Sequence, residues 1–208
     1  MVPLDLWSRS GPVDEAALRR ALSRPAGASS DFDLNPGTVQ PEGRVLRPAA
    51  VLVAVWDRPG GLQVILTKRA SHLKHHPGQI AFPGGKVDPT DASRRAAALR
   101  EAYEEVALPS DQVRILGALP AHETVTGFDM TPFLAVVDGD FTAIPEAGEV
   151  EEVFCVPLAH LADRTRYRIE RRQWRGQWRR YYAVPYGPYY IWGATARILR
   201  GLAERLAP

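Results

Sequence analysis

The sequence contains a single cysteine, Cys155, among its 208 residues. One thiol excludes an internal disulfide framework, and no second cysteine completes a CxxC metal or redox pair. This cysteine usage favours a reducing compartment, so we expect a cytoplasmic protein.

Long apolar runs are also missing. The longest, residues 49–56, is far too short to span a bilayer. The N-terminus MVPLDLWSRS lacks the basic start, apolar stretch and small-residue cleavage site of a signal peptide. We therefore expect a soluble protein with no membrane partner.

An excess of charge of either sign is absent as well. There are 26 Lys and Arg residues against 24 Asp and Glu, and the net charge of +2 is too small to indicate a nucleic-acid partner. The hydrophobic content of 45% disfavours a disordered chain. The length suits one large domain with an extra segment. We expect residues 1–45 to form an N-terminal helical arm and linker, and residues 46–208 to form the domain.

The apolar pattern predicts an α+β fold. A nearly continuous apolar run at residues 48–57 indicates a strand buried on both faces, and the turn signal at residues 58–61 pairs it with a second strand at 61–69. Helical patterns occupy residues 13–22, 91–107 and 192–206, and further strands are predicted at 113–119, 131–137, 150–156, 167–173 and 177–184. This order predicts a mixed β-sheet sandwiched between helices.

The segment REAYEEVAL, residues 100–108, gathers Glu101, Glu104 and Glu105 within one stretch of predicted helix. The expected apolar stripe consists of Leu99, Ala102, Tyr103 and Val106, with the three glutamates on the opposite face. One interpretation is a solvated helix face. Two physical costs count against it, because Glu101 and Glu105 repel by about 0.2–0.5 kcal/mol and each anion near the helix C-terminus costs about 0.3–1 kcal/mol.

A bound cation would relieve both costs. Carboxylate oxygens without neighbouring His or Cys residues suit Mg²⁺ or Mn²⁺ better than zinc. Carboxylates at i and i+4 can reach one ion, so Glu101 and Glu105 are the main candidate ligands, with Glu104 at a second ion or its water shell. Mg²⁺ usually shares its coordination sphere with substrate phosphates, so the cluster indicates a phosphate-bearing substrate.

The segment GGKVDPTDASRRAAALREAYEEVAL, residues 84–108, resembles the Nudix box of Mg²⁺-dependent hydrolases that cleave nucleoside diphosphates linked to another group. Two positions depart from the usual box. Asp91 stands where a glutamate is common, with one extra residue before Arg100, and Ala107 stands where glycine usually ends the helix. Ala107 predicts either another geometry for the helix end or a left-handed turn strained by about 1 kcal/mol.

The preceding segment LTKRASHLKHHPGQIAFPGG, residues 66–85, resembles the motif found before the box in Nudix coenzyme A pyrophosphatases, and Asp91 is also similar to that subfamily. The resemblance covers residues 50–202. It implies an α/β/α Nudix-type sandwich and hydrolysis of coenzyme A or its derivatives, such as acyl-CoA, to 4′-phosphopantetheine and adenosine 3′,5′-bisphosphate with Mg²⁺ or Mn²⁺. Another nucleoside diphosphate derivative, such as ADP-ribose, is the alternative substrate.

The candidate catalytic residues come from the same segments. The Gly85 carbonyl is a further candidate metal ligand, because glycine lets the backbone approach an ion. By resemblance, Glu149 is the first candidate for the general base and Glu104 the second. Arg100 is expected to orient the glutamates or contact phosphate, with a simple i, i+4 pairing to Glu104 as the alternative.

Four residues of the upstream motif are candidate substrate contacts: Arg69, His76, Gln79 and Phe82. An arginine at a strand end suits bidentate phosphate binding. No cysteine or spaced histidine pair completes a zinc site with His76, so a substrate contact or a part in loop structure is favoured. Phe82 is alternatively a core residue, and Gln79 a polar loop residue.

The segment RTRYRIERRQWRGQWRRYY, residues 164–182, is the most basic and aromatic part of the chain. Such interleaving also occurs in single-stranded nucleic-acid platforms, so an RNA-binding Nudix-like module is a competing hypothesis. We favour a hairpin in which Tyr167 and Ile169 face the core, Arg166 and Arg168 face water, and the two tryptophans, Trp174 and Trp178, pack across the turn. Some of its arginines could meet the 3′-phosphate of coenzyme A.

Overall fold

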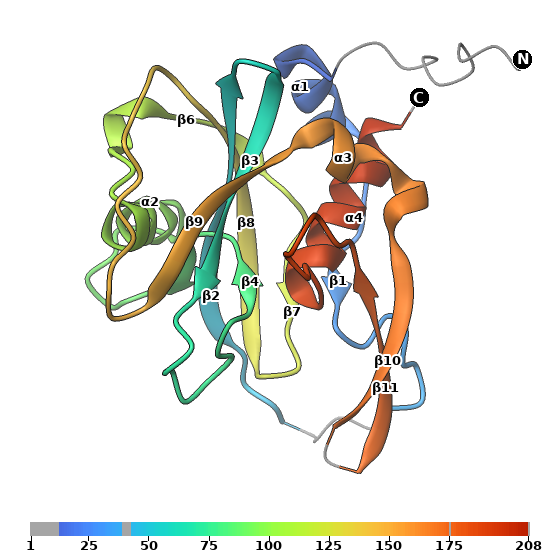
Figure 1. The fold of residues 1–208 in the computed structure, drawn as a ribbon. Coiled ribbons are helices and arrows are strands. Elements are labelled where there is room, and N and C mark those ends of the chain that lie inside the picture. The colour runs from blue at the N-terminus through green and yellow to red at the C-terminus, as the bar shows by residue number, and fades with distance from the viewer. Residues whose placement is uncertain (1–12, 39–42, 175, 208) are drawn as a thin grey trace, which may run out of the picture.

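Strand β2 (Arg47–Arg58) runs through the middle of the molecule in the computed structural model, which describes residues 13–38, 43–174 and 176–207 (Figure 1). It pairs parallel to β8 (Phe128–Val137) and antiparallel to β3 (Gly61–Arg69) and β5 (Gly84–Lys86), so the sheet is mixed. The other strands of this sheet are β1 (Ser29–Ser30), β4 (Ile80–Ala81), β6 (Val113–Ala118), β7 (His122–Glu123) and β9 (Val150–Pro157).

Helices cover both faces of this sheet. The helices are α1 (Glu15–Ser23), α2 (Arg94–Val106), α3 (Leu158–Ala162) and α4 (Ala194–Leu206), with single 3₁₀ turns at η1 (Ser110–Gln112) and η2 (Arg164–Arg166). Figure 1 shows α2 on one side of the sheet and α1, α3 and α4 on the other. The predicted α+β sandwich is confirmed. Within the described ranges, no helix is long and apolar enough to cross a membrane.

The double-sided burial of β2 follows from its sequence. Successive strand residues point to opposite faces, so Val51, Val53 and Val55 pack with α1, α3 and α4, while Leu52, Ala54 and Trp56 pack with α2. These six residues are at most 6% exposed. An uninterrupted apolar run is therefore required here, as predicted, because neither face of β2 meets water.

Helix α1 is attached to α4 by reciprocal hydrogen bonds between the C-terminal ends of the two helices. The buried Arg205 guanidinium donates to the carbonyls of Ala21 and Leu22 at 2.7 and 2.8 Å, and Arg24 donates to the Arg205 carbonyl at 2.9 Å. Leu18 of α1 is fully buried in the shared core. The described part of the predicted arm thus packs on the domain, and a boundary near residue 45 stays a prediction.

The segment after α1 is held to the sheet through a buried histidine. His122 is fully buried, and its two ring nitrogens lie 2.9 Å from Ser29 Oγ and 3.2 Å from Asp31 Oδ1. Asp31 also accepts the backbone N–H of Val125 at 2.8 Å. Because a buried polar group without partners is costly, this network fixes the register in which β1 pairs with β7.

The arginine-rich segment forms the predicted hairpin, β10 (Arg168–Trp174) and β11 (Gln177–Ala183), as a separate two-stranded sheet. Tyr167 packs against the core as expected, and Arg166 and Arg168 are exposed. The predicted burial of Ile169 is wrong, because its side chain is 56% exposed. The reason is that the hairpin stands apart from the main sheet. Packing of two tryptophans across the turn stays untested, since the Trp174 side chain lies outside the described residues.

Candidate functional site

Helix α2 presents one of its glutamates to the protein interior. Its N-cap, Ser93, accepts a hydrogen bond from the Ala96 N–H at 3.1 Å. The buried residues of the helix are Ala97, Ala98, Ala102, Glu105 and Val106. Tyr103, expected in the apolar stripe, is 61% exposed. That expectation is wrong because the helix turns its small alanine side chains toward β2, and this rotation carries Glu105 inward.

Glu105 is almost fully enclosed, with 5% of the residue exposed. Its Oε2 accepts the Gly84 N–H at 3.1 Å, and its Oε1 lies 3.9 Å from Arg69 Nη1. Burial, with the nearby charge of Glu101 as a smaller cause, raises the pKa of Glu105 to about 7 against the opposing hydrogen bond from Gly84. A buried carboxylate with such a pKa is typical of functional sites.

The glycine strand β5 lies directly against the glutamates. A Cβ atom on Gly85 would meet Glu101 Oε1 at 2.5 Å, and one on Gly84 would meet the Ala50 carbonyl oxygen at 2.5 Å. Only glycine allows both close approaches, and Gly84 also has a φ of +149°. Burial raises the pKa of Glu101, although the charge of Arg100 opposes this shift.

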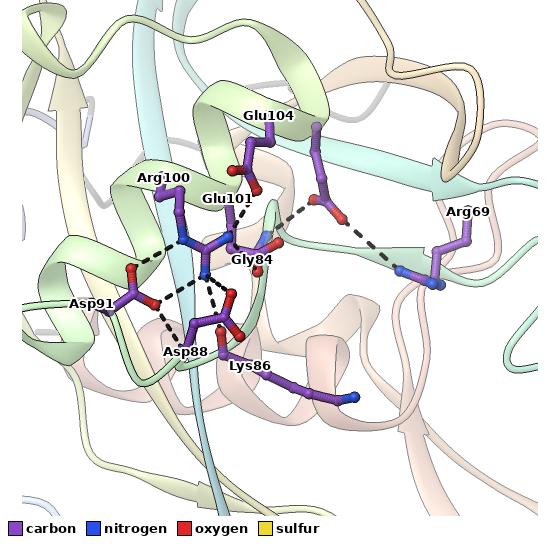
Figure 2. A network of polar contacts seen from close by, with 9 residues as sticks. Arg69, Gly84, Lys86, Asp88, Asp91, Arg100, Glu101 and Glu104 are labelled. Atoms are coloured by element: carbon purple, nitrogen blue, oxygen red, sulfur yellow. Dashed lines mark hydrogen bonds and ion pairs between the residues drawn. The ribbon is translucent and has the colours of Figure 1, made fainter.

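Arg100 is the centre of an acidic network, which Figure 2 shows. Its guanidinium donates twice to Asp91 at 3.0 Å, and once each to Glu101 at 3.1 Å and Glu104 at 2.8 Å. Arg100 therefore pairs with Glu104 and also holds Glu101, whereas a contact with phosphate stays a prediction. The bond from Arg100 lowers the pKa of Asp91. The part played by Asp91 was missed in the sequence, although its unusual place in the box was the available signal.

Glu149 comes close through the loop between β8 and β9. This loop crosses the end of α2, where the Glu146 N–H donates to the Glu105 carbonyl at 3.0 Å and the Ile144 N–H donates to the Val106 carbonyl at 3.1 Å. The charge of Glu149, whose side chain is exposed, raises the pKa of both Glu101 and Glu105. The structure thus brings the first candidate base near the two candidate ligands.

The loop after β3 connects Arg69 with two other predicted substrate contacts. The Arg69 N–H donates to the Gln79 carbonyl at 3.0 Å, and the Gly78 N–H returns to the Arg69 carbonyl at 3.1 Å. His76 adopts a left-handed φ of 55°. Partial desolvation, followed by the charge of Arg69, lowers the pKa of His76, and a hydrogen bond with Gln79 opposes this. Phe82 is 3% exposed and belongs to the hydrophobic core, in agreement with its alternative interpretation as a core residue.

Helix α2 ends in a left-handed turn despite its alanine. Ala107 has φ 58° and ψ 29°, and its N–H donates to the Tyr103 carbonyl at 2.9 Å. Of the two alternatives for this position, the strained turn is correct and another geometry is wrong. The following Leu108 is fully buried, and its N–H donates to the Ala102 carbonyl at 3.3 Å. Burial of the Leu108 side chain stabilises the fold by about 1.5–3 kcal/mol, which outweighs the backbone strain at Ala107.

The donor chemistry of the site fits a hard divalent cation. Glu101 and Glu105 offer carboxylate oxygens, each with a raised pKa that a nearby cation would lower, and Gly85 allows close approach of the backbone. No three His, Cys, Asp or Glu residues in the described ranges lie close enough together to form a ready-made metal cage.

A mixed sheet between helical layers, with a glycine strand held against a glutamate-bearing helix, defines a Nudix-type fold. Residues 46–177 match the family model described as NUDIX domain. The chain is 48% identical over 162 residues to the "Uncharacterized Nudix hydrolase NudL" of Enterobacter sp. (strain 638), covering 77% of this chain and 83% of that protein. The protein of the same name from Salmonella newport (strain SL254) is 48% identical over 161 residues, with the same coverage.

Among solved structures, the NUDIX domain of Shewanella oneidensis NrtR complexed with ADP ribose matches with a TM-score of 0.51. It is 16% identical, and the match covers 83% of this chain and 96% of that one, which supports the fold alone. The chain belongs to the Nudix hydrolase family and is an enzyme. Members of this family act on nucleoside diphosphate derivatives and generally use divalent metals such as Mg²⁺ or Mn²⁺.

Proposed function

We propose that this enzyme hydrolyses the pyrophosphate bond of coenzyme A or one of its derivatives, with Mg²⁺ or Mn²⁺ as its metal ion. One observation carries the proposal. The segment that resembles coenzyme A pyrophosphatases, residues 66–85, contacts one carboxylate from both of its ends, because Arg69 and Gly84 converge on Glu105. The segment that carries the resemblance to that subfamily therefore adjoins a candidate metal ligand, which supports the proposal.

The carboxylates of Glu101 and Glu105 would hold the ion, with Glu104 and the Gly85 carbonyl as further ligands. When bound, the ion supplies positive charge to the pyrophosphate oxygens and acidifies a coordinated water. Arg100 orients Glu101 and Glu104 through its hydrogen bonds. Arg69, about one quarter exposed, is placed to donate to a phosphate at the edge of the site.

Hydrolysis requires that a water oxygen bonds to one phosphorus while the bond from that phosphorus to the bridging oxygen breaks. The proton lost by the water passes to a base, and the electron pair of the broken bond stays on the departing phosphate. Glu149 is our first candidate base and Glu104 the second. Both side chains are exposed, so either can return the proton to solvent.

The test compares substrates with the purified enzyme in Mg²⁺ or Mn²⁺, using coenzyme A, ADP-ribose and capped RNA at equal concentrations and chromatography of the products. We expect coenzyme A to be cleaved fastest, yielding 4′-phosphopantetheine and adenosine 3′,5′-bisphosphate. Consumption of ADP-ribose while coenzyme A survives would overturn the substrate assignment and leave the family membership intact. Cleavage by Glu105→Gln at the wild-type rate would remove the metal-ligand assignment.

A further inference from the structure

The β10–β11 hairpin carries a surplus of positive charge among its described residues. Four of its arginines are exposed: Arg168, Arg171, Arg172 and Arg180. In the part of the chain that the structure describes, none of these four forms an ion pair with a carboxylate. The acid within the hairpin, Glu170, instead accepts a hydrogen bond from the Tyr190 hydroxyl at 2.5 Å.

The two faces of the hairpin differ in their aromatic contacts. Arg172 pairs with Arg179 across the strands, and its guanidinium lies over the Trp192 ring at 4.8 Å from the centroid. Arg171, the next residue, points to the opposite face and lies over Trp178 at 4.9 Å. These neighbours therefore carry the same charge on the same strand while facing different surroundings.

The Arg172 face adjoins the loop that carries the predicted substrate contacts. Trp192 precedes Gly193, and a Cβ atom on Gly193 would lie 3.7 Å from Gln79 Nε2. The Gln79 backbone is hydrogen-bonded to Arg69, which in turn faces Glu105. Figure 1 shows the hairpin apart from the main sheet, on the side that carries α4. The Gln79 side chain thus lies close to Gly193, the residue after Trp192, while the Gln79 backbone is bonded to the arginine that faces the glutamates.

We infer that Arg172, supported by the Trp192 ring, binds a phosphomonoester on the nucleoside half of the substrate. A guanidinium stacked on a ring keeps its edge N–H groups available for a bidentate bond to phosphate. Under the proposed function, on which this inference rests, that group is the 3′-phosphate of the coenzyme A ribose. The glutamates would then act on the pyrophosphate while the hairpin recognises the additional phosphate.

The test measures kcat/KM for coenzyme A and for 3′-dephospho-coenzyme A, which differ in this one phosphate. Calorimetry also compares the binding affinities of adenosine 3′,5′-bisphosphate and AMP, and this readout needs no turnover. We expect wild-type enzyme to prefer the 3′-phosphorylated member of each pair. Arg172→Gln should reduce that preference about 10- to 100-fold, the effect of one charge-assisted hydrogen bond, and Arg172→Lys should restore part of it.

Arg171→Gln is the matched control, because it removes the same charge from the opposite face and should leave both preferences unchanged. An equal loss of preference in Arg172→Gln and Arg171→Gln would overturn the inference, since it would reflect only a general attraction between positive charge and the anionic substrate. The inference also fails if Arg172→Gln reduces binding and turnover of both members of a pair to the same extent. It fails too if the substitution instead lowers the salt-sensitive binding of a single-stranded oligonucleotide. Failure of wild-type enzyme to cleave either coenzyme would refute the proposed function, whereas the binding comparison would still decide the phosphate site.

Discussion

Replacement of Glu105 by glutamine should stabilise the metal-free protein while abolishing its activity. A free glutamate titrates near 4.5, and burial raises the pKa of Glu105 to about 7. Each pKa unit corresponds to about 1.4 kcal/mol, so ionised Glu105 destabilises the folded state by about 3 kcal/mol above pH 7. Glutamine fills the same space without charge and still accepts the Gly84 N–H.

The pH dependence has a definite sign. Between pH 4.5 and 7 the folded protein binds more protons at Glu105 than the unfolded chain does, so stability falls as pH rises through this window. The advantage of Glu105→Gln should therefore be about 3 kcal/mol at pH 8 and less than about 1 kcal/mol at pH 5. For a chain of this length, the difference at pH 8 raises Tm by roughly 6–12 °C.

Calorimetry in EDTA at the two pH values measures this effect, and assays with Mg²⁺ or Mn²⁺ measure the loss of turnover. Glu104→Gln serves as the control, because Glu104 is exposed on the same helix and should change stability little. A Glu105→Gln protein that is less stable than wild type at pH 8, or equally stabilised at both pH values, would refute the reasoning. Such a result would mean that the contacts with Arg69 and Gly84 compensate the cost of burying the ionised Glu105 carboxylate.

Four further substitutions test other parts of the structure. Gly85→Ala should lower kcat at least tenfold with the fold retained, because its Cβ would push the Glu101 carboxylate aside. Gly84→Ala should instead lower Tm, because its Cβ would meet backbone atoms. Equal effects of the two substitutions on Tm would contradict this reasoning. Ala107→Gly should raise the free energy of unfolding in urea by about 1 kcal/mol, and a loss would show that the turn is unstrained. Arg205→Met should cost about 2–3 kcal/mol and increase hydrogen exchange in α1, and unchanged exchange there would exclude the proposed attachment.

The long strands were predictable because their patterns reflect local physics. β2 meets a helical layer on each face, so its buried run had to be continuous, and the paired β3 follows directly across a turn. The two-residue strands β1, β4 and β7 have no period to detect, and they are defined only by their pairing with other strands. The five-residue helix α3 is too short for a periodic signal for the same reason.

The sequence predicted the cluster of glutamates in the candidate site, but not the geometry that the structure gives them. The sequence placed Glu101, Glu104 and Glu105 on one face, yet the structure buries Glu105 and leaves Glu104 exposed. A helical pattern cannot show how far a helix rotates against its sheet, which depends on the small side chains at the contact. The bond from Arg100 to Asp91 spans nine residues and depends on the loop before α2, whose conformation has no periodic signature.

The charges around Arg100 and Arg69 explain why the glutamates are costly without an ion. Within the described chain, Arg100 meets four carboxylates, those of Asp88, Asp91, Glu101 and Glu104, and Arg69 meets a fifth, that of Glu105. Two guanidiniums cannot neutralise five ionised carboxylates, and the remaining negative charge contributes to the raised pKa values of Glu101 and Glu105. A divalent cation would offset two of the three remaining negative charges, and the anionic substrate would then approach through Arg69 rather than against bare carboxylates.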